Sequence, residues 1–285
     1  MFRKLPEPRR DQSSNAMTGR PAHLPDYKNP PVSEVMLGVQ FRPPTGYTQI
    51  QAGEVWNLFR AEYPKVEEHP PITPTFETFG PRQVVQVPFN LMTGASHDRF
   101  WFISESETEL IQFQEDRMLH NWRQMGLAEN AYPRFEAMIG KFEEELHTFS
   151  RFVGGLAPQE LEINQCEVTY INIIALKEIE GSRPGTWIKG FDLPVGATED
   201  FSYTFRRIIQ SEAGQPSGRL ICEILSGRTS EQEPVIRMTI TVRGAPSSSR
   251  IEDALTYLKE GRDLIVLAFT EFTTDVAHKH WERVK

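Results

Sequence analysis

The sequence predicts an α+β fold in which one unit, an antiparallel sheet followed by a long amphipathic helix, occurs twice along the chain. Three observations support this prediction. Short runs alternate between apolar and polar side chains, as half-buried strands do, and two long stretches repeat apolar residues every three or four positions, as helices do. These elements also follow one another in the same order in the two halves of the chain. We expect two sheets, or one continuous sheet, covered by the two long helices.

The first strand lies between two pairs of prolines. Pro31 and Pro43 limit it to residues 35–41, because proline lacks the backbone N–H that a strand ladder needs and restricts the residue before it. Gly38 lies inside this strand, where we interpret it as a point of twist rather than a close approach by another backbone. The apolar residues that share the opposite face, toward the core, are Val35, Leu37, Val39 and Phe41.

The remainder of the first half predicts one short helix and then a series of strands. Residues 48–63 have helical spacing, with Thr48 as the N-cap and Pro64 as the end. A rigid, proline-rich connector follows at residues 69–74. The strands expected after it are residues 75–79, 83–89 and 99–104, then a hairpin over residues 110–122 with its turn at residues 114–117. Strands in such close succession pair antiparallel.

A wide apolar stripe predicts the first long helix. Charged residues, among them Glu143, Glu144 and Glu145, fill the rest of its surface, and Gly154 with Gly155 is expected to end it. A stripe of this kind is typical of a helix that packs on a sheet. The residues of the stripe are Phe135, Met138, Ile139, Phe142, Leu146, Phe149, Phe152 and Val153.

The second half repeats this order of elements. Its expected strands are residues 166–174, 201–209, 219–225 and 235–242, whereas residues 184–194 predict no helix. The final helix is expected to begin near Ser249, because Ser249 and Glu252 have the spacing of a capping box. Its apolar stripe continues to about Val276.

The order of elements resembles that of TATA-binding-protein-like and helix-grip folds, and we expect a similar arrangement. The two units are residues 29–158 and 159–285, either as separate units or joined into one domain. Residues 1–28 have no apolar periodicity and are rich in proline, arginine and serine, so we expect a flexible tail that folding does not need. A fold analogy does not specify a function.

Composition excludes several classes of protein. The net charge of −8 disfavours a surface that binds nucleic acid. No apolar run approaches the roughly 18 residues of a membrane helix. Cys166 and Cys222, the two cysteines of the chain, both lie in expected strands, which fits a reducing compartment better than a disulfide framework. We therefore expect a cytoplasmic protein that binds neither membranes nor nucleic acid.

Sequence motifs for common chemistries are missing. The chain has no glycine-rich dinucleotide or P-loop motif, no H-E-x-x-H or C-x-x-C pair and no G-x-S-x-G nucleophile elbow. His278 and His280 would point about 200° apart on a helix and so would not share a metal. We expect no catalytic residues, no metal and no cofactor.

Two weaker patterns supply candidate binding residues. Asn121 and Arg123 share a strand face, where they suit an anionic ligand or a partner's carboxylate, or else pair across strands on an outer face. Asn172 interrupts an apolar strand beside Tyr170, and a buried amide needs a partner. It is either a structural hydrogen-bond hub or a ligand contact in a cavity between sheet and helix.

Several segments together resemble a sporadically distributed bacterial family with no established activity. They are Asn-Pro-Pro-Val-Ser-Glu-Val at residues 29–35, the hairpin of residues 110–123 ending in Asn-Trp-Arg, Tyr-Ile-Asn at 170–172, Gly-Arg-Asp at 261–263 and His-Trp at 280–281. The resemblance spans about Tyr27 to Trp281. It implies no catalytic residues, and a patchy distribution would fit mobile, defence-associated or toxin–antitoxin loci.

These observations favour a non-enzymatic binding protein that acts on a partner protein, through protein–protein contact, or on a small ligand. The chain has a well-patterned core, yet its sequence brings together no acid, base, nucleophile or metal set. The alternative is an enzyme or small-ligand-binding protein that uses a cavity between sheet and helix. The ligand or partner and the oligomeric state are not specified by the sequence.

Overall fold

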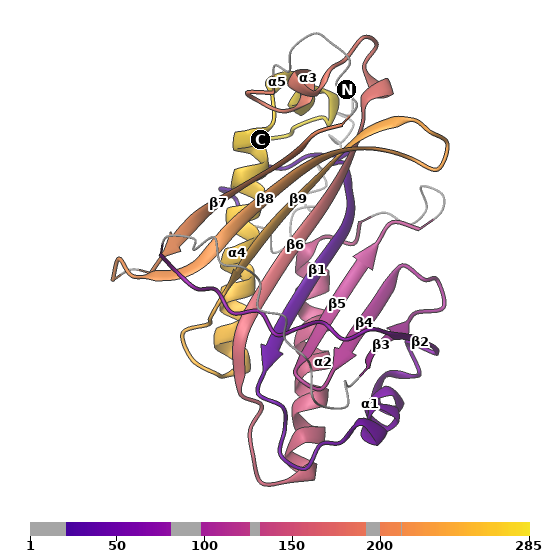
Figure 1. Ribbon diagram of the computed structural model, residues 1–285, viewed down its shortest axis with the longest axis vertical. Helices are drawn as coiled ribbons and strands as arrows, with labels where there is room; N and C mark the ends of the chain where they lie inside the picture. The colour runs from indigo at the N-terminus through magenta and orange to yellow at the C-terminus, as the bar shows by residue number, and fades with distance from the viewer. Residues whose placement is uncertain (1–20, 81–97, 126–131, 192–199, 212) are drawn as a thin grey trace, which may run out of the picture.

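The chain forms one continuous nine-stranded antiparallel sheet with helices on one side. A computed structural model describes residues 21–80, 98–125, 132–191, 200–211 and 213–285. The strands are β1 (Val32–Phe41), β2 (Lys65–His69), β3 (Arg99–Ile103), β4 (Glu109–Gln114), β5 (Arg117–Arg123), β6 (Ile163–Ala175), β7 (Ser202–Gln210), β8 (Pro216–Arg228) and β9 (Pro234–Gly244). Their order in the sheet is β2-β3-β4-β5-β1-β6-β9-β8-β7 (Figure 1). The α+β class and the antiparallel sheet are therefore confirmed.

The middle of the sheet is the antiparallel pair β1 and β6, which joins the two halves of the chain. Leu37 lies opposite Val168 and Val39 opposite Cys166 in this pair. All four side chains are buried on the face that carries the helices. The period-two pattern of the first strand is thus confirmed, and β1 begins three residues earlier than expected.

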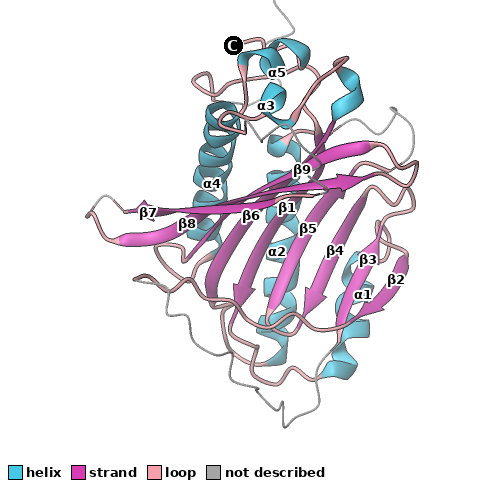
Figure 2. Cartoon of the chain, turned by 45° about the horizontal axis from the view of Figure 1, so that its top comes forward, coloured by secondary structure: helices cyan, strands magenta, loops and turns pink. Residues whose placement is uncertain are grey.

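Two long helices cover one face of the sheet: α2 (Phe135–Leu156) and α4 (Ile251–Phe272) (Figure 2). Phe142 and Phe149 of α2, like Leu258 of α4, are fully buried against the strands. The two helices also contact each other, where the Arg262 guanidinium lies 3.1 Å from a Glu136 carboxylate oxygen. The predicted stripe of α2 is confirmed, although Gly154 and Gly155 lie inside α2 rather than after it. The stripe of α4 is confirmed as far as Phe269, whereas Val276 lies in α5 and is exposed.

The shorter helices depart further from expectation. They are η1 (Gln49–Gln51), α1 (Ala52–Phe59), η2 (Leu176–Glu178), α3 (Pro184–Trp187) and α5 (Asp275–His280). The helix expected over residues 48–63 thus ends early, and residues 184–194 do contain a short helix. The C-terminal helix begins after Arg250 and breaks at Thr273, and Thr274 then caps α5 by accepting the Ala277 N–H.

The expected tail extends less far than residue 28. Leu24 is fully buried, and Tyr27 is 5% exposed. The Tyr27 ring packs on Phe269 and Trp281, and its hydroxyl lies 2.9 Å from Thr270 Oγ1 in α4. Residues 21–28 therefore belong to the folded body, because the side chains of Leu24 and Tyr27, too few to define a periodic pattern, still reach the core.

Two further findings limit the chemistry of the described chain. No helix in those residues is long and apolar enough to cross a membrane. Cys166 and Cys222 are free thiols buried in the sheet. Burial raises the pKa of Cys222 to about 12 and that of Cys166 further, so neither thiol is a reactive nucleophile at neutral pH.

Replacing Phe142 by alanine tests the packing of α2 on the sheet. Phe142 has no exposed surface, so Phe142→Ala should lower the free energy of unfolding by about 3–5 kcal/mol. Glu144→Ala, on the exposed side of the same helix, should change it by less than about 0.5 kcal/mol. Chemical denaturation measures both, and equal losses would contradict the observed helix phase.

A pair of truncations tests the contribution of residues 21–28. Deleting residues 1–28 removes Leu24 and Tyr27, whose burial stabilises the fold by about 3 kcal/mol or more. The melting temperature should therefore fall by about 10 °C relative to a chain that begins at residue 21. Indistinguishable melting curves would show that this segment adds nothing to stability.

Candidate functional site

The face of the sheet without helices is polar and rich in arginine. The β registers place Gly38, Gln40, Arg117, Leu119 and Asn121 together on this face, with Glu167 opposite Gly38. Positively charged side chains are concentrated on this face, although the net charge of the whole chain is −8. The arginines whose register positions fall on this face are Arg99, Arg117, Arg123, Arg206, Arg219, Arg237 and Arg243. We call it the arginine face.

An extended segment, residues 70–80, crosses the arginine face from β2 toward β8, and we call it the strap (Figure 1). Its residues 75–79 were expected to form a strand, and this prediction is wrong. Side-chain amides rather than a strand ladder hold its backbone. Ile72 N–H donates to Gln114 Oε1 at 2.8 Å and Ile72 C=O accepts from Gln114 Nε2 at 3.0 Å, while Thr75 N–H donates to Gln40 Oε1 at 3.0 Å.

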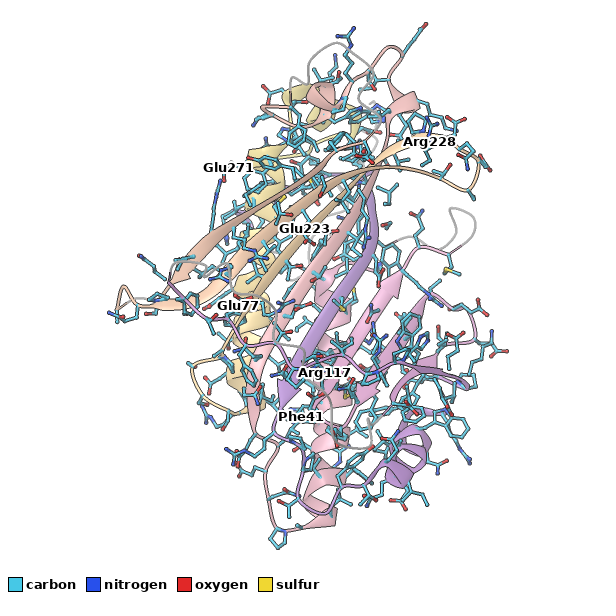
Figure 3. The ribbon with its side chains drawn as sticks, viewed as in Figure 1. Phe41, Glu77, Arg117, Glu223, Arg228 and Glu271 are labelled. Carbon is cyan, nitrogen blue, oxygen red and sulfur yellow. The ribbon has the colours of Figure 1, made fainter. Side chains whose placement is uncertain are left out.

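A buried carboxylate fixes the far half of the strap. The Glu77 side chain is 6% exposed and lies 2.7 Å from Arg219 Nη1 and 3.5 Å from Arg243 Nη1. Arg219 also donates to the Thr78 carbonyl at 2.9 Å and lies over the Phe79 ring. Figure 3 shows Glu77 on the strap and Arg117 beside the strap. A buried carboxylate is tolerated here because two guanidinium groups pair with it.

A cavity of about 270 Å³ lies between the strap and the sheet. Gly38 leaves room for it and allows a close approach by Leu119, since an added Cβ would lie 3.1 Å from the Leu119 side chain. Gly38 thus accommodates a neighbouring side chain, and the three atoms nearest to an added Cβ all belong to Leu119 rather than to another backbone. The polar side chains that line the cavity include Gln40, Arg99, Gln112, Arg117, Gln165 and Glu167.

Two of the sequence-predicted residues lie on the arginine face. Asn121 is 1% exposed, accepts from Gln112 Nε2 at 3.0 Å and donates to Glu34 Oε1 at 2.6 Å. It does not line the cavity but orients Gln112, which does. Arg123 donates through Nε to the Glu107 carbonyl at 2.9 Å, and its guanidinium lies 5.8 Å from the centre of the Trp101 ring.

The other two predicted residues lie on the opposite face, under α4. The Tyr170 hydroxyl lies 2.8 Å from that of Tyr132, and Asn172 Nδ2 donates to the Met238 carbonyl at 3.2 Å. Tyr170 and Asn172 line a cavity of about 50 Å³, much smaller than the one beneath the strap. The sheet therefore separates the four candidates into two pairs, and they do not form one site.

A buried Tyr–Glu–His group lies between α2 and β5. Glu145, expected on the exposed side of α2, accepts from the Tyr63 hydroxyl at 2.5 Å and lies 3.0 Å from His120 Nδ1. Burial and the Glu145 charge raise the pKa of Tyr63 far above its usual value. His120 is fully buried, so a substrate would not reach the imidazole. The group links helix to sheet and offers no accessible catalytic site.

Sequence reasoning missed Glu77, Arg99 and Gln165. They come from the strap, β3 and β6, so only the sheet register and the path of the strap bring them together. A usable signal was the alternation of Gln112 and Gln114 with Ile111 and Phe113, which places amides on the face opposite the core.

Comparison with protein-family models, with curated proteins and with solved structures finds no match. The site must therefore be interpreted from its own geometry.

Substitution of Glu77 tests how firmly the strap is held. Glu77→Gln removes the buried charge with which two half-buried arginines pair, so the free energy of unfolding should fall by about 2 kcal/mol. Glu68→Gln, at an exposed position of β2, is the matched control and should have little effect. Denaturant titration at low and high salt measures both variants. Equal losses, or a loss that salt abolishes, would contradict a buried ion pair.

Proposed function

We propose that the protein is a non-enzymatic binding protein whose arginine face holds an extended acidic segment of a partner protein. One observation carries this proposal: the chain's own strap lies across that face as an extended polypeptide, with its carboxylate between two arginines. In this proposal, the strap occupies, within the same chain, the site to which a segment of the partner would bind.

The contacts of the strap support recognition of a polypeptide in general. Gln114 both donates to and accepts from the backbone of Ile72, and Gln40 accepts from the backbone of Thr75. Such contacts suit any extended chain, because they do not depend on its side chains. The sequence preference would come from the carboxylate position, where Arg219 and Arg243 meet Glu77.

The charge distribution favours an acidic protein segment over nucleic acid. A cationic face attracts either polyanion, but the whole chain carries −8 and several of its guanidinium groups already pair with carboxylates. Nucleic-acid affinity comes largely from free Lys and Arg groups that neutralise many phosphates. A single buried carboxylate position suits one acidic side chain better than a run of phosphates.

We also infer that the sheet arose from a duplicated unit, arranged as in TATA-binding-protein-like folds. In sheet order, β1, β5, β4 and β3 correspond to β6, β9, β8 and β7, and α2 corresponds to α4. The correspondence supports an approximate two-fold axis between β1 and β6. It implies nothing about the partner.

The family resemblance adds a proposal about where the partner is encoded. A sporadically distributed bacterial family fits defence or toxin–antitoxin loci, so we propose a cytoplasmic partner encoded beside this gene. Two free buried cysteines agree with a reducing compartment.

A synthetic peptide with the sequence of residues 70–80 tests the proposed function. Fluorescence anisotropy should show the labelled peptide binding to Glu77→Lys, in which the strap is repelled by two arginines, with a Kd of about 100 µM or tighter. The peptide should bind most tightly to Glu77→Lys, less tightly to Glu77→Gln and most weakly to the unchanged protein. If Glu77→Lys does not fold, the peptide titration of Glu77→Gln provides the same test.

Three controls make this test specific. A peptide carrying glutamine at the position of Glu77, and a scrambled peptide, should each bind at least tenfold more weakly. Single-stranded DNA should not bind at about 0.15 M salt. Failure of both Glu77 variants to bind the peptide, equal binding of the scrambled sequence, or tight salt-sensitive DNA binding would overturn the proposal.

A further inference from the structure

The cavity beneath the strap contains polar atoms with no partner in the described chain. Arg99 Nε and Gln165 Oε1 are both buried and make no hydrogen bond there. Both residues line the cavity, and Gln165 as a whole is 8% exposed. Buried polar atoms are nearly always paired, so a donor and an acceptor left unpaired around one space are available to a polar ligand in that space.

The charge of Arg99 is also uncompensated. Among the described residues, no carboxylate lies within ion-pair distance of it, and its Nη1 donates to the neutral Gln112 Oε1 at 2.5 Å. Burial, and then the positive charge of Arg117, lower the pKa of Arg99. Arg117 differs, because it forms a two-point ion pair with Asp116. Arg99 is therefore the cation in this cavity that an anion would stabilise.

The surrounding contacts hold the arginine in place. Its guanidinium lies 5.5 Å from the centre of the Trp101 ring, and Gln112, which accepts from it, in turn donates to Asn121. Asn121 is fixed by Glu34. This relay keeps Arg99 oriented before any ligand arrives, which lowers the entropic cost of binding.

We propose that the cavity under the strap binds a small oxyanion that also carries a hydrogen-bond donor, with its anionic oxygens on Arg99 and its donor on Gln165. The volume of about 270 Å³ admits either a polyatomic ion such as phosphate or a small organic acid. The strap closes the cavity through Ile72 and Thr75. The proposed contacts on Arg99 and Gln165 are separate from the ion pairs of Glu77, although Arg243 of those pairs also lines the cavity, and anion binding does not require the strap to leave.

Titration of the unchanged protein with matched pairs of anions tests the proposal. Inorganic phosphate at pH 7 retains a proton to donate, whereas sulfate has the same shape and none. Lactate and acetate form the corresponding carboxylate pair. Calorimetry should show saturable binding of phosphate or lactate with a Kd below about 1 mM, at least tenfold tighter than its acceptor-only analogue. The pair that binds identifies the oxyanion as phosphate or carboxylate.

Three variants assign the contacts. Arg99→Gln should weaken binding at least tenfold, and Gln165→Leu should remove the preference for the donor-bearing anion. Arg237→Gln, an equal loss of charge at an exposed position of the same face, should bind as the unchanged protein does. The melting temperature of each variant without anion shows that it has folded.

The proposal is overturned if neither phosphate nor lactate binds with a Kd below about 10 mM. It is also overturned if Arg99→Gln and Arg237→Gln lose affinity for the anion equally. Peptide binding by the Glu77 variants has no influence on these outcomes, because the anion titrations use the protein with its strap in place.

Discussion

The antiparallel pairing of β1 with β6 is the contact on which the rest of the structure depends. It turns two groups of strands into one sheet and brings α2 and α4 to the same face. It also makes the arginine face continuous, so a strap that follows β2 in the first half reaches Arg219 and Arg243 in the second. A slip of one residue would move Val168 to the polar face and expose apolar surface, which makes other registers costly.

Much of the fold follows from local patterns. The stripe of α2 and the alternation of β1 and β5 each place apolar side chains on one surface, and the sheet confirms them. β2 escaped prediction because it is an edge strand of mostly charged, exposed residues, held by its pairing with β3. Residues 75–79 are rich in threonine and phenylalanine, which favour strands, yet in the strap the side chains of Gln114 and Gln40 accept from the backbone of Ile72 and Thr75 and no neighbouring strand of the described chain does.

The candidate site was predictable only in part. Strand parity alone places Asn121 and Arg123 on one face, and the structure agrees with that placement. The alternation of side chains along one strand does not show that Tyr170 and Asn172 lie on the opposite face of the sheet from Asn121 and Arg123. That placement depends on how β5, β1 and β6 pair. Nor does the alternation show the path of the strap, which brings Glu77 to arginines more than a hundred residues later in the chain. The site is assembled by tertiary contacts.

The attachment of the strap to β2 sets a condition on any partner. A segment tethered beside its own binding surface acts as a ligand at a high effective concentration, on the order of millimolar for a short connection. A free peptide with the same contacts would rarely displace it. A competing partner must therefore either bind more tightly than the strap does or be held nearby through a second contact. If the proposed function holds, the arginine face is protected from weak acidic segments elsewhere in the cell and responds only to a partner that meets one of these two conditions.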